Sequence, residues 1–395
     1  MITRNKIALA IVALAFAGIA NAQMSFENVL QQVDSNNLML KALRQKLEAE
    51  RIAARIGLSP SNPQAEVIYQ WGSPVAIGNK TTISITQQFD FPTAYIYRAK
   101  LAKGMANALE NEYRSKRSEV LHKAGLLYAD LVYHNALLVE LNRQLKNAMV
   151  IAQSLKQKFD AGEIGIIPYT QAELVYHELN SRITQVKLEQ KSLADELGAL
   201  NGSVALAIAD SVMLVPELPD SFESWIGLAE SQNPELAYLK SETENSRLKL
   251  KLSKAEVLPT FNAGYAREKV VGERFQGIVV GISIPLWEKS NTVRYARANE
   301  RYMQLLADDY LFSFRQRTQQ LFSKAKTLQE LANQLNQNIS NLDIAGKLFL
   351  ALQKGEISIV DYYTELNSYN SIKERLLEVQ HECLKTYIEL NRFAY

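Results

Sequence analysis

Side chains that could bind a metal or act as nucleophiles are few in this chain, and they lie far apart. The four histidines fall on separate stretches of helical character: His122, His134, His177 and His381. The one cysteine, Cys383, lies two residues after His381, and residues two apart on a helix point to nearly opposite sides. With no ligand cluster, nucleophile triad or glycine-rich phosphate loop, the sequence predicts no metal site, no cofactor and no enzyme.

The first residues predict export from the cytoplasm. Arg4 and Lys6 precede an apolar run over 7–19, and Ala20-Asn21-Ala22 follows as a cleavage-site pattern. We expect a signal peptide over 1–22, with a retained N-terminal helix as the alternative. The mature chain would begin at Gln23 rather than at a cysteine, so we do not expect the usual bacterial lipoprotein anchor.

The composition argues against two classes of protein. Lys and Arg number 44 and Asp and Glu 42, a balance without the basic excess that nucleic-acid binding needs. Beyond the signal, no apolar run reaches the roughly 18 residues of a membrane-spanning helix. A single cysteine also allows no disulfide within the chain.

The chain is a tandem repeat. Ser25-Phe26-Glu27 recurs as Ser221-Phe222-Glu223, and the hexapeptide at 162–167 has its counterpart at 355–360. A repeat of this length indicates an architecture built by symmetry rather than one catalytic pocket. We divide the mature chain into a first repeat over 23–205, a linker over 206–220 and a second repeat over 221–395.

Each repeat contains a helix much longer than those of ordinary globular cores. No proline lies between Thr93 and Phe159, and a helix over 93–159 would be about 100 Å long. The second repeat has the same feature over 290–354. Apolar residues recur there every seven positions, which predicts a seam that packs against another helix. A plain coiled-coil rod would carry the same seams.

Two extended segments precede each long helix, near 65–71 and 81–91 and again near 260–267 and 275–284. Ile278, Val280 and Ile282 alternate with small residues, which suits a barrel wall between lipid and water. A soluble hairpin pair packed on a core is the alternative. Aromatic residues, which collect at membrane interfaces, lie near the strand ends: Tyr69, Trp71, Phe89, Phe91 and Trp287.

Four strands cannot close a barrel, and an open strand edge inside a bilayer would leave backbone groups without hydrogen bonds. Several copies must therefore share one sheet. Three copies would give twelve strands, a number within the range known for outer-membrane barrels. We expect a trimer, although edge closure alone does not fix the number at three.

In its repeated order of helix, hairpin, very long helix, turn and returning helix, the chain resembles the TolC-like outer-membrane efflux protein family over its whole mature length. Family-like pieces are Asn233-Pro234-Glu235-Leu236, Leu258-Pro259 and the segment 281–287. The turns at 161–166 and 354–359 resemble the family's periplasmic tips. The Gly-Glu-Ile sequence of the turns, with Tyr362, Leu366 and Asn367 after the second, is similar to the heavy-metal efflux branch.

The resemblance implies a mainly α fold with a small transmembrane β-sheet, built from two tandem helix–hairpin–long helix–helix repeats. It implies a homotrimer with a shared 12-stranded β-barrel in the outer membrane of a Gram-negative-type envelope and an α-helical tunnel across the periplasm. The implied function is the channel of a tripartite efflux system. The implied partners are outer-membrane lipid, a periplasmic adaptor (membrane fusion) protein and an inner-membrane pump of the RND type.

The resemblance also places a pore constriction just after the second turn. A pore-narrowing acid of the family falls on Asp361, and three copies of it would form a ring that attracts cations. A capping or first-turn acid after Ser358 is its other expected role, and the two roles are compatible. Tyr362 lines the same constriction or packs in the helical seam. Thr364 replaces a further acid of many family members, and Pro168 replaces a polar residue in the first repeat.

The turns themselves are candidate tips for docking the adaptor, because exposed isoleucines at a turn are unfavourable unless a partner buries them. Gly162 and Gly355 also fit the left-handed conformation that ends many helices, which is a purely structural role. The candidate docking residues are Gly162, Glu163, Ile164, Gly165, Gly355, Glu356, Ile357 and Ser358.

Two other functions compete with the channel. One is a periplasmic coiled-coil scaffold or adaptor without a channel, although adaptors typically carry one helical hairpin flanked by lipoyl-like and small barrel domains. The other is a secreted pore-forming helical protein. The amphipathic hairpins with aromatic ends favour the channel, and the sequence does not distinguish drugs, metals and peptides as cargo.

Overall fold

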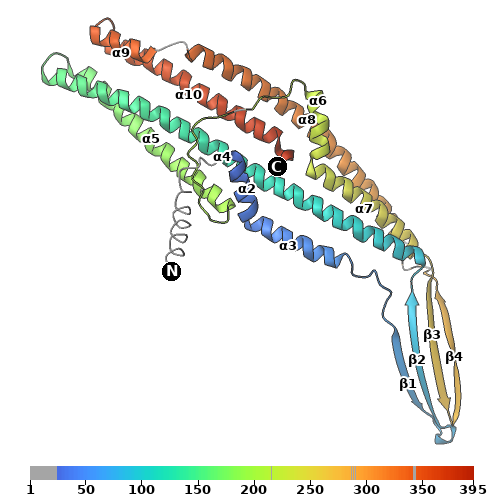
Figure 1. The fold of residues 1–395 in the computed structure, drawn as a ribbon. Coiled ribbons are helices and arrows are strands. Elements are labelled where there is room, and N and C mark those ends of the chain that lie inside the picture. The colour runs from blue at the N-terminus through green and yellow to red at the C-terminus, as the bar shows by residue number, and fades with distance from the viewer. Residues whose placement is uncertain (1–24, 215, 286, 288, 290, 341–343) are drawn as a thin grey trace, which may run out of the picture. The chain divides into compact units, whose positions relative to one another are not determined.

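The computed structural model describes residues 25–395 apart from 215, 286, 288, 290 and 341–343. The signal peptide expected over 1–22 lies outside the described residues. Helices make up most of the described chain, and the strands form one antiparallel sheet in the order β1-β2-β3-β4 (Figure 1). The mainly helical fold with a small sheet is thereby confirmed.

The two halves of the chain share an order of two helices, two strands, a long helical stretch and a returning helix. The first contains α2 (Phe26–Asn36), α3 (Leu38–Ala53), β1 (Gln64–Trp71), η1 (Val75–Ile77), β2 (Asn79–Phe89), α4 (Pro92–Asp160) and α5 (Ile166–Leu200). The second contains α6 (Phe222–Gln232), α7 (Pro234–Glu256), β3 (Thr260–Val270), β4 (Glu273–Ser283), α8 (Thr292–Ser340), α9 (Ile344–Lys354), α10 (Ile359–Leu390) and η2 (Arg392–Ala394). The long helix expected over 290–354 is described as α8 and α9, on either side of 341–343. Among the helices of the described residues, none is both long enough and apolar enough to cross a lipid bilayer.

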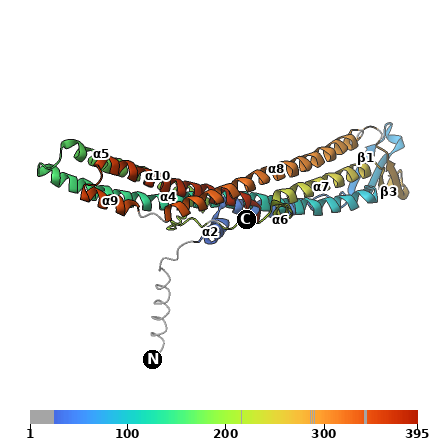
Figure 2. The same cartoon turned by 90° about the horizontal axis from the view of Figure 1, so that it is seen from above.

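The long helices pack along their seams. α4 is one continuous helix of 69 residues. Next to the turn that follows it, α4 and α5 lie side by side (Figures 1 and 2). Farther from the turn, Leu137 and Leu141 of α4 meet Ile183 and Val186 of α5 in a buried cluster. In the first repeat, the long helix therefore packs against another helix along an apolar seam.

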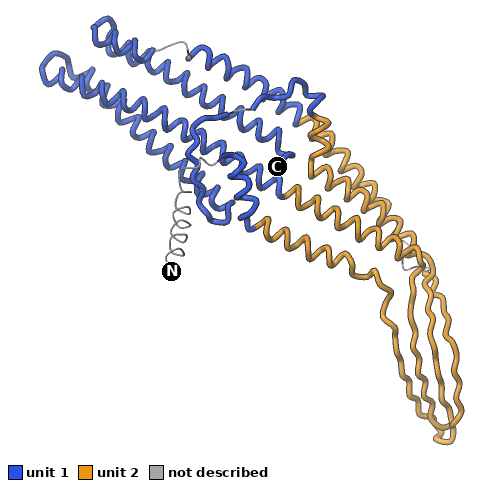
Figure 3. The backbone as a smooth tube through the Cα atoms, in the orientation of Figure 1, with its two compact units in different colours: residues 1–38, 117–225, 318–395 blue, residues 39–116, 226–317 orange. Residues whose placement is uncertain are grey.

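The chain divides into two compact units (Figure 3). Unit 1 comprises 1–38, 117–225 and 318–395, and unit 2 comprises 39–116 and 226–317. The largest buried cluster of unit 1 joins α2, α4, α5 and α10 with the inter-repeat segment, from which Leu206 and Met213 are buried. The Asn135 side chain of α4 donates to the carbonyls of Ile208 and Asp210, which holds this segment against the helix.

The sheet of unit 2 has one apolar and one polar or small face. Residues directly opposite in antiparallel strands share a face, and the register pairs Val67 with Ile83, Ile85 with Tyr265, and Tyr265 with Ile278. The other face carries mainly polar and small residues, among them Thr82, Ser84, Thr86, Gln88, Asn262, Gly264, Gly277, Gly281 and Ser283. Most strand residues on both faces are at least partly exposed, and the alternation expected from the sequence is confirmed.

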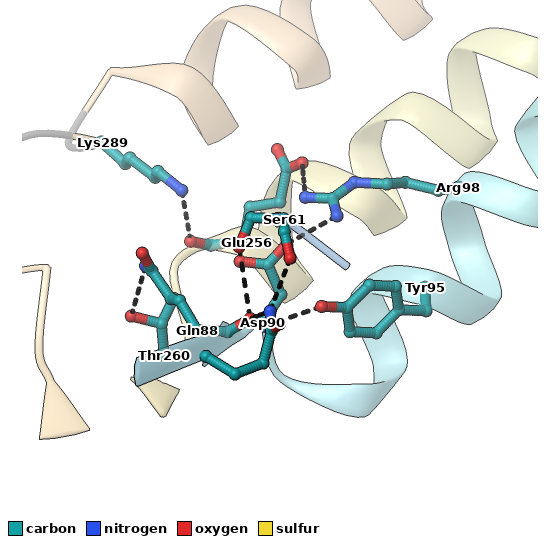
Figure 4. A network of polar contacts seen from close by, with 9 residues as sticks. Ser61, Gln88, Asp90, Tyr95, Arg98, Glu256, Thr260 and Lys289 are labelled. Carbon is teal, nitrogen blue, oxygen red and sulfur yellow. Dashed lines mark hydrogen bonds and ion pairs between the residues drawn. The ribbon is translucent and has the colours of Figure 1, made fainter. Parts of the chain in front are cut away.

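A polar network joins the strand ends to the helices of unit 2 (Figure 4). Arg98, near the start of α4, donates to Asp90 Oδ2 at 2.6 Å and to Glu256 Oε1, at the end of α7, at 3.0 Å. The Lys289 ammonium donates to the Glu256 carbonyl at 2.9 Å. The network therefore ties the first repeat to the second where the strands meet the helices.

Helices α4 and α7 of unit 2 approach closely at Gly104. A Cβ at this position would overlap Oδ1 of Asn245, which is buried and whose amide donates to Glu242 Oε1 at 2.9 Å. The α4 backbone can lie this close to Asn245 because Gly104 has no side chain.

We expect Gly104→Ala to destabilise the protein. Overpacking costs about 1–3 kcal/mol, whereas alanine gains at most about 1 kcal/mol of helix propensity over glycine. The matched control is Gly227→Ala in α6, where an added Cβ meets nothing within 4 Å and should stabilise. Thermal unfolding followed by circular dichroism measures both. Equal changes of the thermal unfolding midpoint in the two variants would contradict the close approach of α4 to Asn245 at Gly104.

Candidate functional site

The two turns between long helices have the same backbone geometry. Gly162 follows α4 with a φ of 74°, and Gly355 follows α9 with a φ of 73°. The next residues, Glu163 and Glu356, donate their N–H groups to carbonyls five residues earlier, at 2.8 and 2.9 Å. This is the Schellman motif, so both glycines have the left-handed conformation expected of them. Glu163, Gly165 and Glu356 are exposed.

A hydrophobic cluster of α4, α5 and α10 lies directly behind the turns. Its buried members are Ile151, Ala152, Leu155, Ala172, Tyr362, Tyr363 and Leu366. Tyr362 is only 2% exposed, so within this chain its ring packs in the seam, one of the two alternatives that the sequence left open. Ile164 and Ile357 pack against the same cluster and are partly buried, which differs from the expectation that the turn isoleucines are exposed.

The exposed apolar side chains of the tips come just after these isoleucines. Ile166 and Ile167 at the start of α5 are 61% and 77% exposed, and Val360 at the start of α10 is 55% exposed. Ile167 and Val360 hold the same position in the repeated hexapeptide, and this recurrence is the sequence signal that could have identified them. Exposed apolar residues at one position in both turns favour a binding surface.

Asp361 caps helix α10 and remains exposed. Ser358 Oγ accepts from the Asp361 N–H at 3.1 Å, and the Asp361 carboxylate accepts from the Ser358 N–H at 3.2 Å and from its hydroxyl at 2.6 Å. This is a capping box, so the capping role expected for Asp361 is present. Thr364, exposed on the next turn, donates its hydroxyl to the Val360 carbonyl at 2.9 Å.

Behind the tips, a partly buried polar network links the helices of the two repeats. The Glu374 carboxylate of α10 accepts hydrogen bonds from both terminal guanidinium nitrogens of Arg182 on α5. It also accepts a hydrogen bond from the side-chain amide of Gln144 on α4, at 3.1 Å. Burial favours the neutral form of Glu140, but hydrogen bonds from Arg143 and Gln144 outweigh it and keep the pKa of Glu140 below its ordinary value. Sequence reasoning missed this network, because no local pattern pairs residues so far apart.

A second, partly buried charge cluster joins α4 to α10. Asp130 Oδ1 accepts from His381 Nε2 at 2.6 Å and from Lys385 Nζ at 3.0 Å. The His381 ring also stacks on Tyr133, with ring centroids 4.4 Å apart. Burial alone would raise the pKa of Asp130, but the hydrogen bonds and charges of His381 and Lys385 hold it below its ordinary value. Asp130 is therefore ionised at neutral pH and offsets the charge of Lys385.

The potential metal ligands lie apart. Cys383 is buried with its Sγ toward the Ala325 carbonyl of α8, whereas His381 reaches Asp130 of α4. Burial raises the pKa of the Cys383 thiol to about 11, so it remains protonated. Within the described ranges, no group of three or more His, Cys, Asp or Glu residues is placed to hold a metal ion.

Aromatic side chains mark both ends of the sheet. Tyr69 and Trp71, 54% and 78% exposed, lie where β1 ends, and their rings are 6.4 Å apart. At the end next to the helices, Phe91 packs against Phe261 with ring centroids 6.3 Å apart. Phe89 is 39% exposed at the end of β2, and Trp287, after β4, is 82% exposed.

Comparison with known proteins identifies the fold. No protein-family model matches the chain. It is 28% identical to the alkaline protease secretion protein AprF of Pseudomonas aeruginosa over 240 residues, which are 55% of this chain and 48% of AprF. The chain thus spans about half the length of the curated relative it matches.

Two solved channels cover nearly the whole chain. The outer-membrane channel OprN gives a TM-score of 0.78 at 14% identity, over 93% of this chain and 89% of that one. The CmeC outer membrane channel of Campylobacter jejuni gives 0.74 at 15% identity, over 93% and 85%. The chain has the fold of TolC-like outer-membrane channels, as the resemblance predicted.

We expect Asp130→Asn to lower stability most at neutral pH. The pKa of Asp130 is lower in the folded state than in the unfolded state. The stability that its ionised carboxylate contributes is therefore complete above the ordinary carboxyl pKa and is lost as pH falls through the folded-state pKa. The difference in unfolding midpoint from wild type should therefore shrink between pH 7 and pH 3. Asp195→Asn, at an exposed acid of α5, is the control and should have little effect at either pH. A constant deficit for Asp130→Asn across pH would contradict the charge role.

Proposed function

We propose that this chain forms, as a homotrimer, the outer-membrane channel of a tripartite export system. The observation that carries the proposal is the sheet, which has an apolar face and a polar or small face, both largely exposed in one chain. An apolar sheet face exposed to water would be strongly unfavourable, whereas lipid on one side and an aqueous lumen on the other suit both faces.

Edge pairing requires more than one copy, and the resemblance implies three. In the described sheet, β1 and β4 each have a strand partner on one side only. Pairing β1 of one copy with β4 of the next would close twelve strands into a barrel. β4 has 11 residues, about 36 Å in length, and a tilt near 40° would reduce its height to about 28 Å, close to the hydrocarbon thickness of a bilayer.

The helical part of the channel would extend into the periplasm and end at the two turns. Ile167 and Val360, exposed at corresponding positions, together with the Gly162 and Gly355 turns, would dock a periplasmic adaptor protein, which in turn joins an inner-membrane pump. Asp361 and Thr364 would face the tunnel constriction, with Tyr362 supporting them from the buried seam. In this function the chain acts as a duct and not as an enzyme.

Two classes of exported cargo are candidates for this channel. Efflux of small molecules is the function implied by the resemblance, whose heavy-metal branch has similar tip residues. Secretion of a protein is the second candidate, favoured by the similarity to AprF, a protease secretion protein. In both cases the chain supplies the same outer-membrane duct.

The assembly can be tested by native mass. Protein extracted in detergent from isolated outer membranes should have the mass of three mature chains, because shared strands satisfy the sheet edges and three copies give the 12-stranded barrel that the resemblance implies. Multi-angle scattering or native mass spectrometry gives this mass. Recovery as a soluble periplasmic monomer would instead leave the coiled-coil scaffold as the function.

The constriction can be tested by conductance. Asp361→Asn keeps an oxygen that can accept the Ser358 N–H but removes the charge, so cation preference in planar bilayers should fall several-fold while the unfolding midpoint stays near that of wild type. Glu178→Gln, at an exposed acid of α5, is the control with the same charge change. An unchanged reversal potential in Asp361→Asn would remove Asp361 from the pore.

A further inference from the structure

Three arginines line one open hollow on the first turns of α8, in unit 2. Arg294, Arg297 and Arg301 are exposed, and they surround a depression of about 550 Å³ together with Ala298, Glu300 and Gln304. Their spacing of three and four residues places them on one side of the helix. The opposite side of α8 packs inward, where Ala296 is buried.

This arrangement is unfavourable for the isolated chain. α8 begins at Thr292 without an acidic residue in its first turn, so Arg294 lies at the positive end of the helix dipole. Like charges three and four residues apart also destabilise a helix. Among the described residues, none of the three arginines forms an ion pair, and Glu300 pairs instead with Arg247 at 3.7 Å. An external anion would offset all of these costs.

The side chains of the hollow indicate the chemistry of this anion. Guanidinium groups bind phosphate through two parallel hydrogen bonds, and several of them together suit a phosphodiester. Beside the arginines on α8, Tyr295 and Tyr302 are 74% and 59% exposed, and Leu305 is 51% exposed. Guanidinium groups that can bind a phosphate, next to exposed apolar side chains, fit an amphipathic anion better than a free phosphate.

The position along the chain agrees with a lipid, provided that the proposed function holds. β4 ends at Ser283, α8 starts at Thr292, and the exposed Trp287 lies between them. Arg294 is about 3 Å and Arg301 about 14 Å along the helix from Thr292. The headgroup layer of one leaflet is about 5–8 Å thick, so Arg294 and Arg297 would lie at its depth if the sheet spans the hydrocarbon and Thr292 lies at its edge. Arg301 is one turn farther, and its long side chain leans back toward the start of the helix, in the direction of this layer.

We propose that Arg294, Arg297 and Arg301 bind the phosphate headgroup of an anionic phospholipid in the periplasmic leaflet of the outer membrane. The lipid supplies negative charge for the three arginines, because Glu300, the one carboxylate among the described residues that line the hollow, pairs with Arg247. Its acyl chains would extend from the hollow toward the apolar face of the sheet. The site would fix the depth at which the helices leave the membrane.

The test uses the full-length protein purified in neutral detergent, after its oligomeric mass has been measured without added lipid. Native mass spectrometry then counts bound phosphatidylglycerol and, separately, phosphatidylcholine. Wild type should retain phosphatidylglycerol preferentially. The variant Arg294→Gln/Arg297→Gln/Arg301→Gln should lose this binding by roughly a hundredfold in apparent affinity, about fivefold for each guanidinium.

The control variant Lys146→Gln/Lys156→Gln/Lys158→Gln removes the same charge from exposed positions of α4 in unit 1 and should bind lipid as wild type does. If the triple variant is poorly folded, the double variant Arg294→Gln/Arg297→Gln should show about a 25-fold loss. Soluble glycerol phosphate should neither bind tightly nor displace the lipid.

Three results would overturn the site. They are equal lipid binding by wild type and the arginine variants, equally tight binding of glycerol phosphate, and loss of the oligomer in the arginine variants without any lipid, which would assign the arginines to a contact between copies. A failure of the proposed channel function is distinguishable, because it would already appear as a monomeric wild-type mass before lipid is added.

Discussion

The unpaired edges of the four-stranded sheet are the constraint on which the rest of the structure depends. In the described residues β1 and β4 have hydrogen-bonded neighbours on one side only, and an apolar face spreads across all four strands. Further copies would pair with the edge strands, and lipid would cover the apolar face. A multimeric barrel in a lipid bilayer would therefore satisfy both the edges and the apolar face. The hairpins of the two repeats are already joined through β2 and β3, so each copy would contribute a continuous four-stranded third of the barrel rather than two separate hairpins.

Duplication gives this chain two tips with one backbone design and different side-chain chemistry. Both turns end a helix with a left-handed glycine, bury one isoleucine in part and expose an apolar residue three positions later. Only the second turn has a capping box, from Ser358 and Asp361. At the corresponding positions the first has Gly165, which offers no side-chain cap, and Pro168. A repeated scaffold can thus place a carboxylate at every second tip of a symmetric assembly, which halves the number of charges around a central opening.

Charged groups divide between two kinds of surroundings in this protein. Asp130, Glu140 and Glu374 are largely buried between helices and are matched by cations from other helices, which makes them structural. Arg294, Arg297 and Arg301 are exposed and have no such match in the described chain. Burying a charged side chain without a partner costs folding free energy. An exposed charged side chain without a partner is tolerated and can bind a molecule outside the chain. This contrast separates residues that hold the helices together from those available to bind partners.

Features that depend on near neighbours in the chain were predictable from the sequence alone. Alternation along β4, the length of α4, the left-handed glycines and the cap at Asp361 follow from a strand period of two, helix propensity and backbone sterics, which act over a few residues. The burial of Tyr362, the partial burial of Ile164 and the pairing of Arg182 with Glu374 were decided only by the tertiary structure. A heptad pattern states that a helix has a seam but not how far each helix is rotated or shifted against its neighbours. That rotation and shift determine which side chains meet, and they are fixed only when all the helices pack at once.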